Sequence, residues 1–516
     1  MSPHETMADQ TMCRGPEIVA NTLSHSKLQI EPAVALQLRG PVQQHQKEAG
    51  RPWTICYHQP VLYTIHYHRR EVFGIIVLLH AYQQGFTALA LAAIFAGYEL
   101  AGMIVNLLAG MVGARWGIKA TLLAGLTFQL AALAMLFGWQ DHWNKTQAII
   151  FITCSQIMNG IAKDLTKLGG KTVTKLVTPE EKQMALFKMV AWITGFKNSA
   201  KGVGYLLGAA LLTVSYYGAL GFMVGLLLLA YPWAWISLSW DLGRTNRKNI
   251  TFASIFKVNH NIAVLSIARF FLFASRDLWF EVTLPYFLRS AASGIHWSRL
   301  LVGVFLAIWL IAYGQVQSLS PAWVLKPLRQ SPPNKWAAVL WAGLLVICPT
   351  IMASVLLGDN IYGPGRDKTL QIVIITVILY LFCVIFAVNS AVHSYLVVRY
   401  AAGDKVAQTV GFYYMANAGG RLVGTLLSGI LYTYVGDSIV TGFGACFVAS
   451  LIFVLLSSIL AIPIHDNLGG LMCGPCLSCF SNLKEEHSSI GSSEIAVSED
   501  KSKPVSIAVG DPVAVI

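Results

Sequence analysis

The sequence has little charge for its length. Only 12% of its 516 residues are charged, and 25 of them are acidic, whereas an ordinary soluble domain has about 25% charged residues. The hydrophobic share is 55% and the mean hydropathy is +0.57, which excludes a soluble globular protein because one core cannot hide that much apolar surface. The net charge of +12 then indicates lysine and arginine in cytoplasmic loops, and no nucleic-acid partner is expected.

Several other features are missing. The nine cysteines are odd in number and scattered, which excludes a disulfide framework. The first fifty residues lack the apolar core of a signal peptide. No GxxxxGK[ST] loop is present, so ATP is not the expected energy source. The chain has neither a metal-ligand pair on one helix nor a nucleophile elbow, so no enzyme activity, metal or cofactor is expected.

What the sequence has is long apolar runs, each near the roughly 20 residues that a membrane helix needs. They predict an all-α polytopic membrane protein with about twelve transmembrane helices in two six-helix halves, the layout of the major facilitator superfamily. The expected spans are 72–90, 91–113, 118–139, 147–166, 184–213, 216–240, 261–288, 298–320, 336–357, 370–398, 407–434 and 439–463.

Composition divides the chain into five parts. The longest internal hydrophilic break, "SWDLGRTNRKNITFASIFKVNHN", separates the two halves. Lysine and arginine are enriched in every second connection between spans, on the same side of the membrane as this break. Such enrichment indicates the cytoplasmic side, so both termini are expected in the cytoplasm. The plasma membrane is the expected location. The parts are a disordered or atypical arm (1–70), the N-terminal half (71–240), a cytoplasmic linker (241–260), the C-terminal half (261–464) and a disordered cytoplasmic tail (465–516).

The tail begins with "LMCGPCLSC", in which Cys473, Cys476 and Cys479 are spaced by three residues. Cysteines close to the last span are typical of S-acylation. Binding of a thiophilic metal or metalloid is the alternative, although a closed zinc site would need a fourth ligand.

The loop after the second span, "GMVGARWGIK", resembles the loop signature of the major facilitator superfamily. Gly110, Arg115, Gly117 and Lys119 match the pattern, while Ala114 takes the place of its usual acidic residue.

Lysines recur every four residues in "NGIAKDLTKLGGKTVTK", where Lys163 and Lys167 begin the series and Asp164 lies beside the first. Residues four apart stay near one helix face. A positively charged inner loop would explain the series without any ligand. The next span nevertheless adds Lys197 and Lys201 among apolar residues, and a lysine inside a span costs a few kcal/mol unless it faces a cavity or a partner.

The seventh span, "ARFFLFASRDLWFEVTLP", carries Arg269 and Arg276 on one face, with Asp277 and Glu281 on a neighbouring face. Internal ion pairing of Arg276 is one interpretation. The other is that guanidinium groups bind an anionic ligand through paired hydrogen bonds.

Two further spans add Arg421 in "FYYMANAGGRLVGT" and Glu99 in "AGYELAGMIVNL". A carboxylate such as Glu99 inside a span is a candidate proton-coupling site, and pairing with a lysine of a neighbouring helix is the alternative. The spans hold more basic than acidic groups, so the sequence predicts a central cavity for a small, multiply anionic solute.

Four stretches together resemble the organoarsenical efflux permeases of the major facilitator superfamily (the ArsJ type). They are "NGIAKDLTKLGGKTVTKLV", "FKMVAWITGFKNSAKGVGYLLG", "ARFFLFASRDLWF" and "VGFYYMANAGGRLVGTLLSG", and the resemblance extends over roughly 78–463. It implies export of 1-arseno-3-phosphoglycerate, which glyceraldehyde-3-phosphate dehydrogenase makes from arsenate, and hence arsenate resistance. The segment "HYHRRE" departs from the family because it is poor membrane sequence before the first span.

The substrate-binding residues expected on this basis are Lys163, Lys167, Lys197, Lys201, Arg269, Arg276 and Arg421, with Glu99, Asp164, Asp277 and Glu281 for coupling or ion pairing. Two alternative functions stay open. One is a permease or exchanger of the same fold for another organic phosphate or carboxylate. The other is a non-transporting membrane receptor or scaffold whose cysteine-bearing tail recruits partners.

Overall fold

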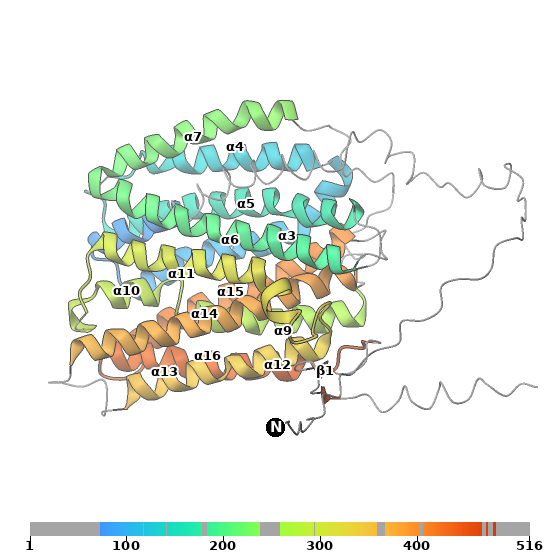
Figure 1. Ribbon diagram of the computed structural model, residues 1–516. Helices are drawn as coiled ribbons and strands as arrows, with labels where there is room; N and C mark the ends of the chain where they lie inside the picture. Colours follow the sequence, from blue (N-terminus) through green and yellow to red (C-terminus); the bar gives the residue numbers. More distant parts are fainter. Residues whose placement is uncertain are drawn as a thin grey trace, which may run out of the picture. The chain divides into compact units, whose positions relative to one another are not determined.

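The structure is a computed structural model. It describes residues 73–116, 118–140, 142–177, 183–237, 258–293, 295–358, 367–401, 406–466, 471–472 and 478–480. Within this part of the chain, helices lie side by side in one bundle (Figure 1).

The described helices follow the expected spans in order. They are Phe73–Gln83, α3 (Ala88–Trp116), α4 (Ile118–Leu136), α5 (Lys145–Val177), α6 (Gln183–Val214), α7 (Tyr216–Ser237), α9 (His260–Asp277), α10 (Thr283–Arg289), α11 (Arg299–Ser320), α12 (Lys335–Leu345), α13 (Ile347–Leu357), α14 (Lys368–Arg399), α15 (Val406–Tyr434) and α16 (Ile439–Leu460), with short turns η1 (Ala291–Ser293) and η2 (Pro321–Leu325). Two boundaries differ clearly from expectation, because the first span ends at a turn through Gly85 (φ 73°) and α5 extends to Val177.

Prolines explain why two expected spans are each divided into two helices. A proline removes one backbone hydrogen bond and its ring clashes with the carbonyl four residues earlier. Pro349, the third residue of α13, therefore explains why α12 ends at Leu345, four residues earlier. Pro285 likewise interrupts the seventh span between α9 and α10, and the interruption holds Glu281 beside the end of α9.

The N-terminal and C-terminal halves meet mainly through two helix pairs. α6 packs most extensively against α11, and α3 packs against α15 (Figure 1). In span order these are the fifth against the eighth and the second against the eleventh. The two contacts are therefore equivalent if two six-span repeats are related by an axis along the membrane normal.

Small residues allow this close approach. A Cβ at Gly202 of α6 would lie 2.5 Å from the carbonyl oxygen of Ala307 in α11, and one at Gly429 of α15 would lie 2.5 Å from Cβ of Ala92 in α3. Helices in membranes associate through such close packing because lipid supplies no hydrophobic driving force between them.

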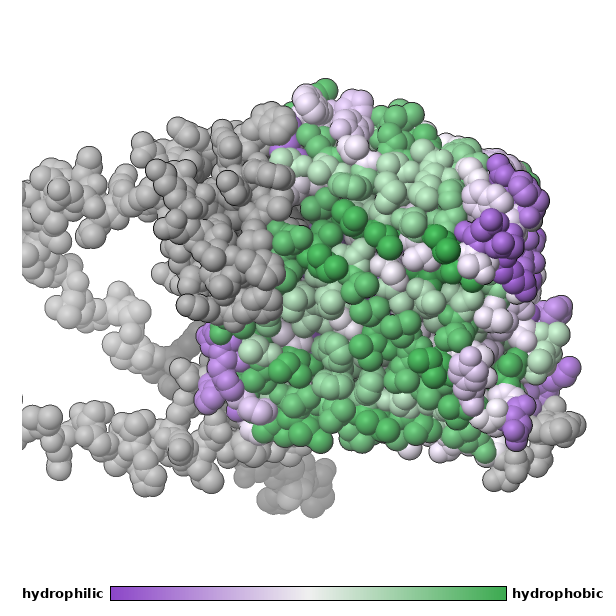
Figure 2. Space-filling model, turned by 180° about the vertical axis from the view of Figure 1, so that it is seen from behind, coloured by the Kyte–Doolittle hydropathy of each residue, from purple (hydrophilic) through white to green (hydrophobic). Residues whose placement is uncertain are grey.

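The face shown in Figure 2 is apolar over the middle of the bundle, with hydrophilic residues toward its edges. Six described segments are long and apolar enough to cross a membrane. α5, α6 and α15 have 33, 32 and 29 residues, and at about 1.5 Å per residue each also exceeds the roughly 30 Å hydrocarbon core. The expectation of an all-α polytopic membrane protein is confirmed.

The packed part of the C-terminal half extends past the expected boundary at Ile464. The Asp466 carboxylate, 1% exposed, accepts hydrogen bonds from Arg399 at 3.0 Å and from the Tyr400 hydroxyl at 2.8 Å. Burial, together with Asp466, raises the pKa of Tyr400 well above its ordinary value, so the hydroxyl stays a donor at physiological pH. Beyond it, β1 (Leu471–Met472) and β2 (Ser478–Phe480) pair as short antiparallel strands within the expected tail.

Replacing Gly202 with alanine should destabilise the bundle by about 1–3 kcal/mol, because the added methyl group forces α6 and α11 apart. Gly221 of α7 is the matched control, since nothing lies within 4 Å of a Cβ built there. Gly221→Ala should leave stability unchanged or raise it by up to about 1 kcal/mol through helix propensity. Thermal unfolding of both variants in detergent checks this, and equal effects would contradict it.

Candidate functional site

The C-terminal end of α9 supplies an arginine and a buried carboxylate. Arg276 donates through Nε to Asp277 Oδ1 at 2.6 Å, and Asp277 is 0% exposed. The Arg276 guanidinium also lies 4.9 Å from the ring centre of Phe273. Of the two interpretations of Arg276, the structure therefore shows the ion pair.

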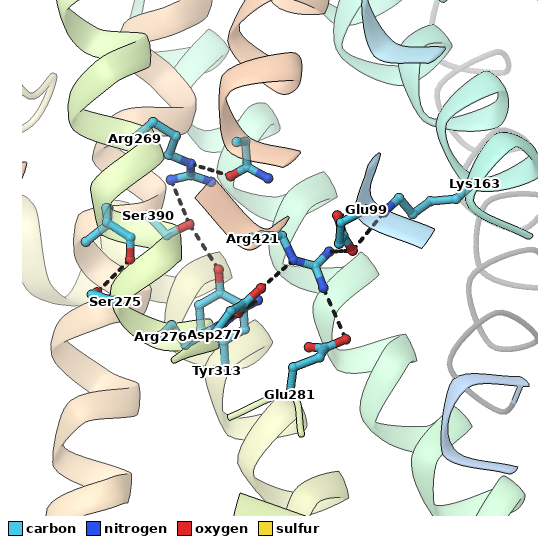
Figure 3. Close-up of polar contacts among 12 residues, drawn as sticks. Glu99, Lys163, Arg269, Ser275, Arg276, Asp277, Glu281, Tyr313, Ser390 and Arg421 are labelled. Carbon is cyan, nitrogen blue, oxygen red and sulfur yellow. Dashed lines mark hydrogen bonds and ion pairs between the residues drawn. The ribbon is translucent and has the colours of Figure 1, made fainter. Parts of the chain in front are cut away.

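Arg421 of α15 is held by three carboxylates at once (Figure 3). Its Nε donates to Asp277 Oδ2 at 2.7 Å, and Nη2 donates to Glu281 Oε1 at 3.1 Å. Its Nη1 lies 3.0 Å from Glu99 Oε1. Because Glu99 belongs to α3 and the others to the C-terminal half, Arg421 joins the two halves through buried charge.

Lys163 of α5 continues this network within the N-terminal half. Its Nζ donates to both oxygens of Glu99 at 3.1 and 3.2 Å and lies 3.5 Å from Asp164 Oδ2. It also lies 4.0 Å from the ring centre of Tyr98, a cation–π contact. A Cβ at Gly102 would meet the Asp164 carboxylate, so glycine leaves the room that this pair needs.

Arg269 of α9 has different surroundings, all of them neutral. Nε donates to the Asn417 side-chain oxygen at 3.1 Å and Nη1 donates to Ser390 Oγ at 3.2 Å. The guanidinium lies 3.9 Å from the ring centre of Phe273 and 5.5 Å from that of Tyr413. No carboxylate of the described residues forms an ion pair with it.

Ser390 of α14 connects Arg269 to the other half through neutral side chains. Tyr313 and Gln317 of α11 both donate to Ser390 Oγ, at 3.0 and 3.2 Å. Asn198 of α6 donates to Gln317 Oε1 at 2.6 Å. A second polar path therefore crosses between the halves, beside the α6–α11 contact.

Within this cluster the buried cations are matched in number by carboxylates. Four carboxylates face four cations, and three of those cations have carboxylate partners. Burying charge in a low-dielectric interior requires such pairing. The four acids are Glu99, Asp164, Asp277 and Glu281, and the four cations are Lys163, Arg269, Arg276 and Arg421.

The surroundings of the other predicted residues are described in part or not at all. Lys197 and Lys201 of α6 are half-buried and make further interactions. Lys119 at the start of α4 is buried, 5.6 Å from the ring centre of Trp235. Four more lie in described elements, but their side-chain surroundings are not described: Lys167 in α5, Gly110 and Arg115 in α3, and Cys479 in β2. Three lie outside the described residues: Gly117, Cys473 and Cys476.

A small cavity of about 10 Å³ adjoins the network between the two halves. Tyr98, Gln156, Asn159, Tyr205 and Glu281 are among its lining residues. Both side-chain amide atoms of Gln156 are buried without a hydrogen-bond partner in the described part of the chain. The volume suits about one water molecule, and the surplus polar atoms suit a polar occupant.

Sequence reasoning missed the neutral partners of Arg269. A signal for some of them was present, because Tyr413, Asn417 and Arg421 recur every four residues in "FYYMANAGGRLVGT" and so share one face of α15. Ser390 was harder to single out within the apolar run of α14. Among the residues with described side chains, no group of three His, Cys, Asp or Glu is arranged to hold a metal ion.

Solved structures resemble this arrangement. A bacterial homologue of the iron transporter ferroportin, in an outward-facing state, superposes with a TM-score of 0.59 at 14% identity, covering 79% of this chain and 98% of its own. The human organic anion transporter MFSD10 superposes with a TM-score of 0.55 at 16% identity, covering 78% of this chain and 98% of its own.

The chain has the major facilitator fold. Identities this low show the fold alone, and they confirm the expected arrangement of helices in two halves. No protein-family model matches the sequence, and no curated protein matches it.

The two carboxylates beside Arg421 provide a matched test of the network. Asp277→Asn should destabilise the protein by about 3–5 kcal/mol, because Asp277 is fully buried between two arginines. Glu281→Gln removes the same charge from a side chain that is 12% exposed, so its effect should be clearly smaller. Chemical unfolding in detergent measures the loss of stability in both variants. Equal losses would contradict the claim that Asp277 neutralises more buried charge than Glu281.

Proposed function

We propose that the protein is a secondary transporter that exports a small organic anion by alternating access. The observation that carries the proposal is the buried ion-pair network that Arg421 makes across the two halves. In the major facilitator fold, the substrate site lies near the bilayer midplane at the interface between repeats, and the halves rock around it. A charge network at that interface is costly to build and is typical of a substrate or ion pathway.

The network suggests how an anion would be bound and released. Lys163 and Arg421 share Glu99, so an incoming anion could take over one of these cations while Glu99 keeps the other. If the anion takes over Arg421, the Glu99 contact between α3 and α15 would loosen. Glu99, Asp164, Asp277 and Glu281 are accordingly proposed as pairing or coupling groups.

The proposed substrate is 1-arseno-3-phosphoglycerate, in line with the organoarsenical efflux permeases that the four sequence stretches resemble. This compound carries an arsenate ester and a phosphate, both anionic, and it is made by glyceraldehyde-3-phosphate dehydrogenase. Its export would confer arsenate resistance with no direct contact between the two proteins. The proposed location is the plasma membrane, with both termini in the cytoplasm.

A second candidate is transport of another organic phosphate or carboxylate, as a permease or exchanger. It is favoured by the similarity to a human organic anion transporter. The described cations of the site would also attract any small anion through their charge, with no group that is specific to arsenic.

Expression of the chain in an arsenate-sensitive host should raise arsenate tolerance, and extra glyceraldehyde-3-phosphate dehydrogenase should increase that tolerance further. Growth in arsenate and arsenic retained by the cells are the measurements, with membrane insertion checked by surface labelling. Arg421→Gln should abolish the tolerance, whereas Arg329→Gln, which neutralises an exposed loop arginine, should keep it. No tolerance from an inserted chain would contradict arsenic export and favour the second candidate. Tolerance that does not depend on the dehydrogenase would contradict the arseno-ester as the exported compound.

A further inference from the structure

Arg269 is set apart from the other buried cations of the site. Lys163, Arg276 and Arg421 each lie within ion-pair distance of a carboxylate, and Arg269 does not among the described residues. It is nevertheless only 5% exposed. A buried charge without a counter-ion is strongly unfavourable, and neutral hydrogen bonds with one close aromatic ring offset only part of that cost.

The guanidinium also keeps free donors. An arginine has five N–H groups in a planar fork, and Arg269 uses one at Nε and one at Nη1. Three N–H groups, including both on Nη2, make no hydrogen bond to the described residues. A free fork edge of this kind matches two oxygens of an oxyanion.

Buried polar groups without partners lie on the same two helices, α14 and α15, that supply the hydrogen-bond partners of Arg269. The Tyr413 hydroxyl, both ring nitrogens of His393 and both side-chain amide atoms of Asn389 are buried with no hydrogen-bond partner in the part of the chain that is described. All three residues are 0% exposed. The Tyr413 ring faces Arg269, and His393 lies about one helical turn from Ser390, which accepts a hydrogen bond from Arg269.

The helices bring these groups together by their periodicity. Asn389 and His393 are four residues apart on α14, and Ser390 precedes His393 by three, so the three lie near one helix face. Tyr413 and Asn417 are four apart on α15. Buried polar groups normally have partners, so a cluster without them beside an unpaired cation indicates a ligand that supplies both oxygens and negative charge.

We propose that Arg269 is the centre of a subsite for the phosphate group of an organic phosphate, with Ser390, Asn417, Tyr413 and His393 around it. This rests on the proposed transport of an organic anion. A tetrahedral group offers three or more oxygens to the free fork and the orphan hydroxyl and ring donors, whereas a carboxylate offers two. The Arg421 network, in which every cation has a carboxylate partner, is a separate part of the site.

Thermal unfolding of the full-length protein in detergent tests this, with 3-phosphoglycerate as the probe. The wild-type protein should be stabilised by the probe. Arg269→Gln should weaken its binding at least about thirtyfold, the loss expected when one partner of a buried charge pair of about 2 kcal/mol is removed. Without the probe, Arg269→Gln should unfold at the same or a higher temperature, since it removes an unpaired buried charge. If Arg269 only stabilised the fold, Arg269→Gln would lower the unfolding temperature of the unliganded protein.

Two conservative variants keep the test independent of folding. Arg269→Lys keeps the charge and loses the fork, so binding should fall while the unliganded unfolding temperature stays unchanged. Tyr413→Phe removes only a hydroxyl that has no described partner, and it should weaken binding severalfold. Arg329→Gln, at an exposed loop position, should bind the probe like the wild-type protein.

Inorganic phosphate and glycerate, used as separate probes, show which part of 3-phosphoglycerate causes the thermal stabilisation. Stabilisation by inorganic phosphate that Arg269→Gln abolishes would support the subsite and assign it to the phosphate group. Stabilisation by glycerate but not by phosphate, or undiminished binding in Arg269→Gln, would overturn the subsite. Phosphate binding that depends on Arg269 in a protein that transports no organic anion would instead leave the subsite standing and contradict the proposed function.

Discussion

The neutralisation of buried charge is the constraint on which the rest of this structure depends. Arg421 lies inside an apolar bundle and is stable there because Glu99, Asp277 and Glu281 converge on it. Since Glu99 comes from the opposite half, the full set of carboxylate partners forms only when the halves are docked. The same contact therefore fixes the geometry between α3 and α15 and offers an anion a place to compete.

The fold supplies the positions from which these charges converge. Glycines at 202 and 429 let the helices of the two halves approach closely, and the interruption before Pro285 holds Glu281 beside Arg421. Around Arg269 the same bundle places only neutral groups. The site thus combines a region of paired charges that joins the halves with an unpaired cation that favours an anionic ligand. Together they suit reversible binding of an organic anion.

The order of the helices and most charged residues of the site could be predicted from the sequence, because apolar length and buried charge are strong local signals. The pairing of these charges could not be predicted. Nothing in the sequence says that Glu99 contacts both Lys163 and Arg421, which lie on different helices. Asp466 was assigned to a disordered tail because a polar segment after the last span carries no packing signal, yet it neutralises Arg399. Such pairings depend on three-dimensional proximity between distant segments.

The central claim is that Glu99 and Arg421 hold the halves together through one interaction. A double-mutant cycle with Glu99→Gln and Arg421→Gln, measured as the free energy of unfolding in detergent, tests it most directly. The account predicts a coupling energy of at least about 1.5 kcal/mol, with the double variant more stable than the sum of the single losses implies. Losses that add to within about 0.5 kcal/mol would contradict it, because independent residues behave in that way.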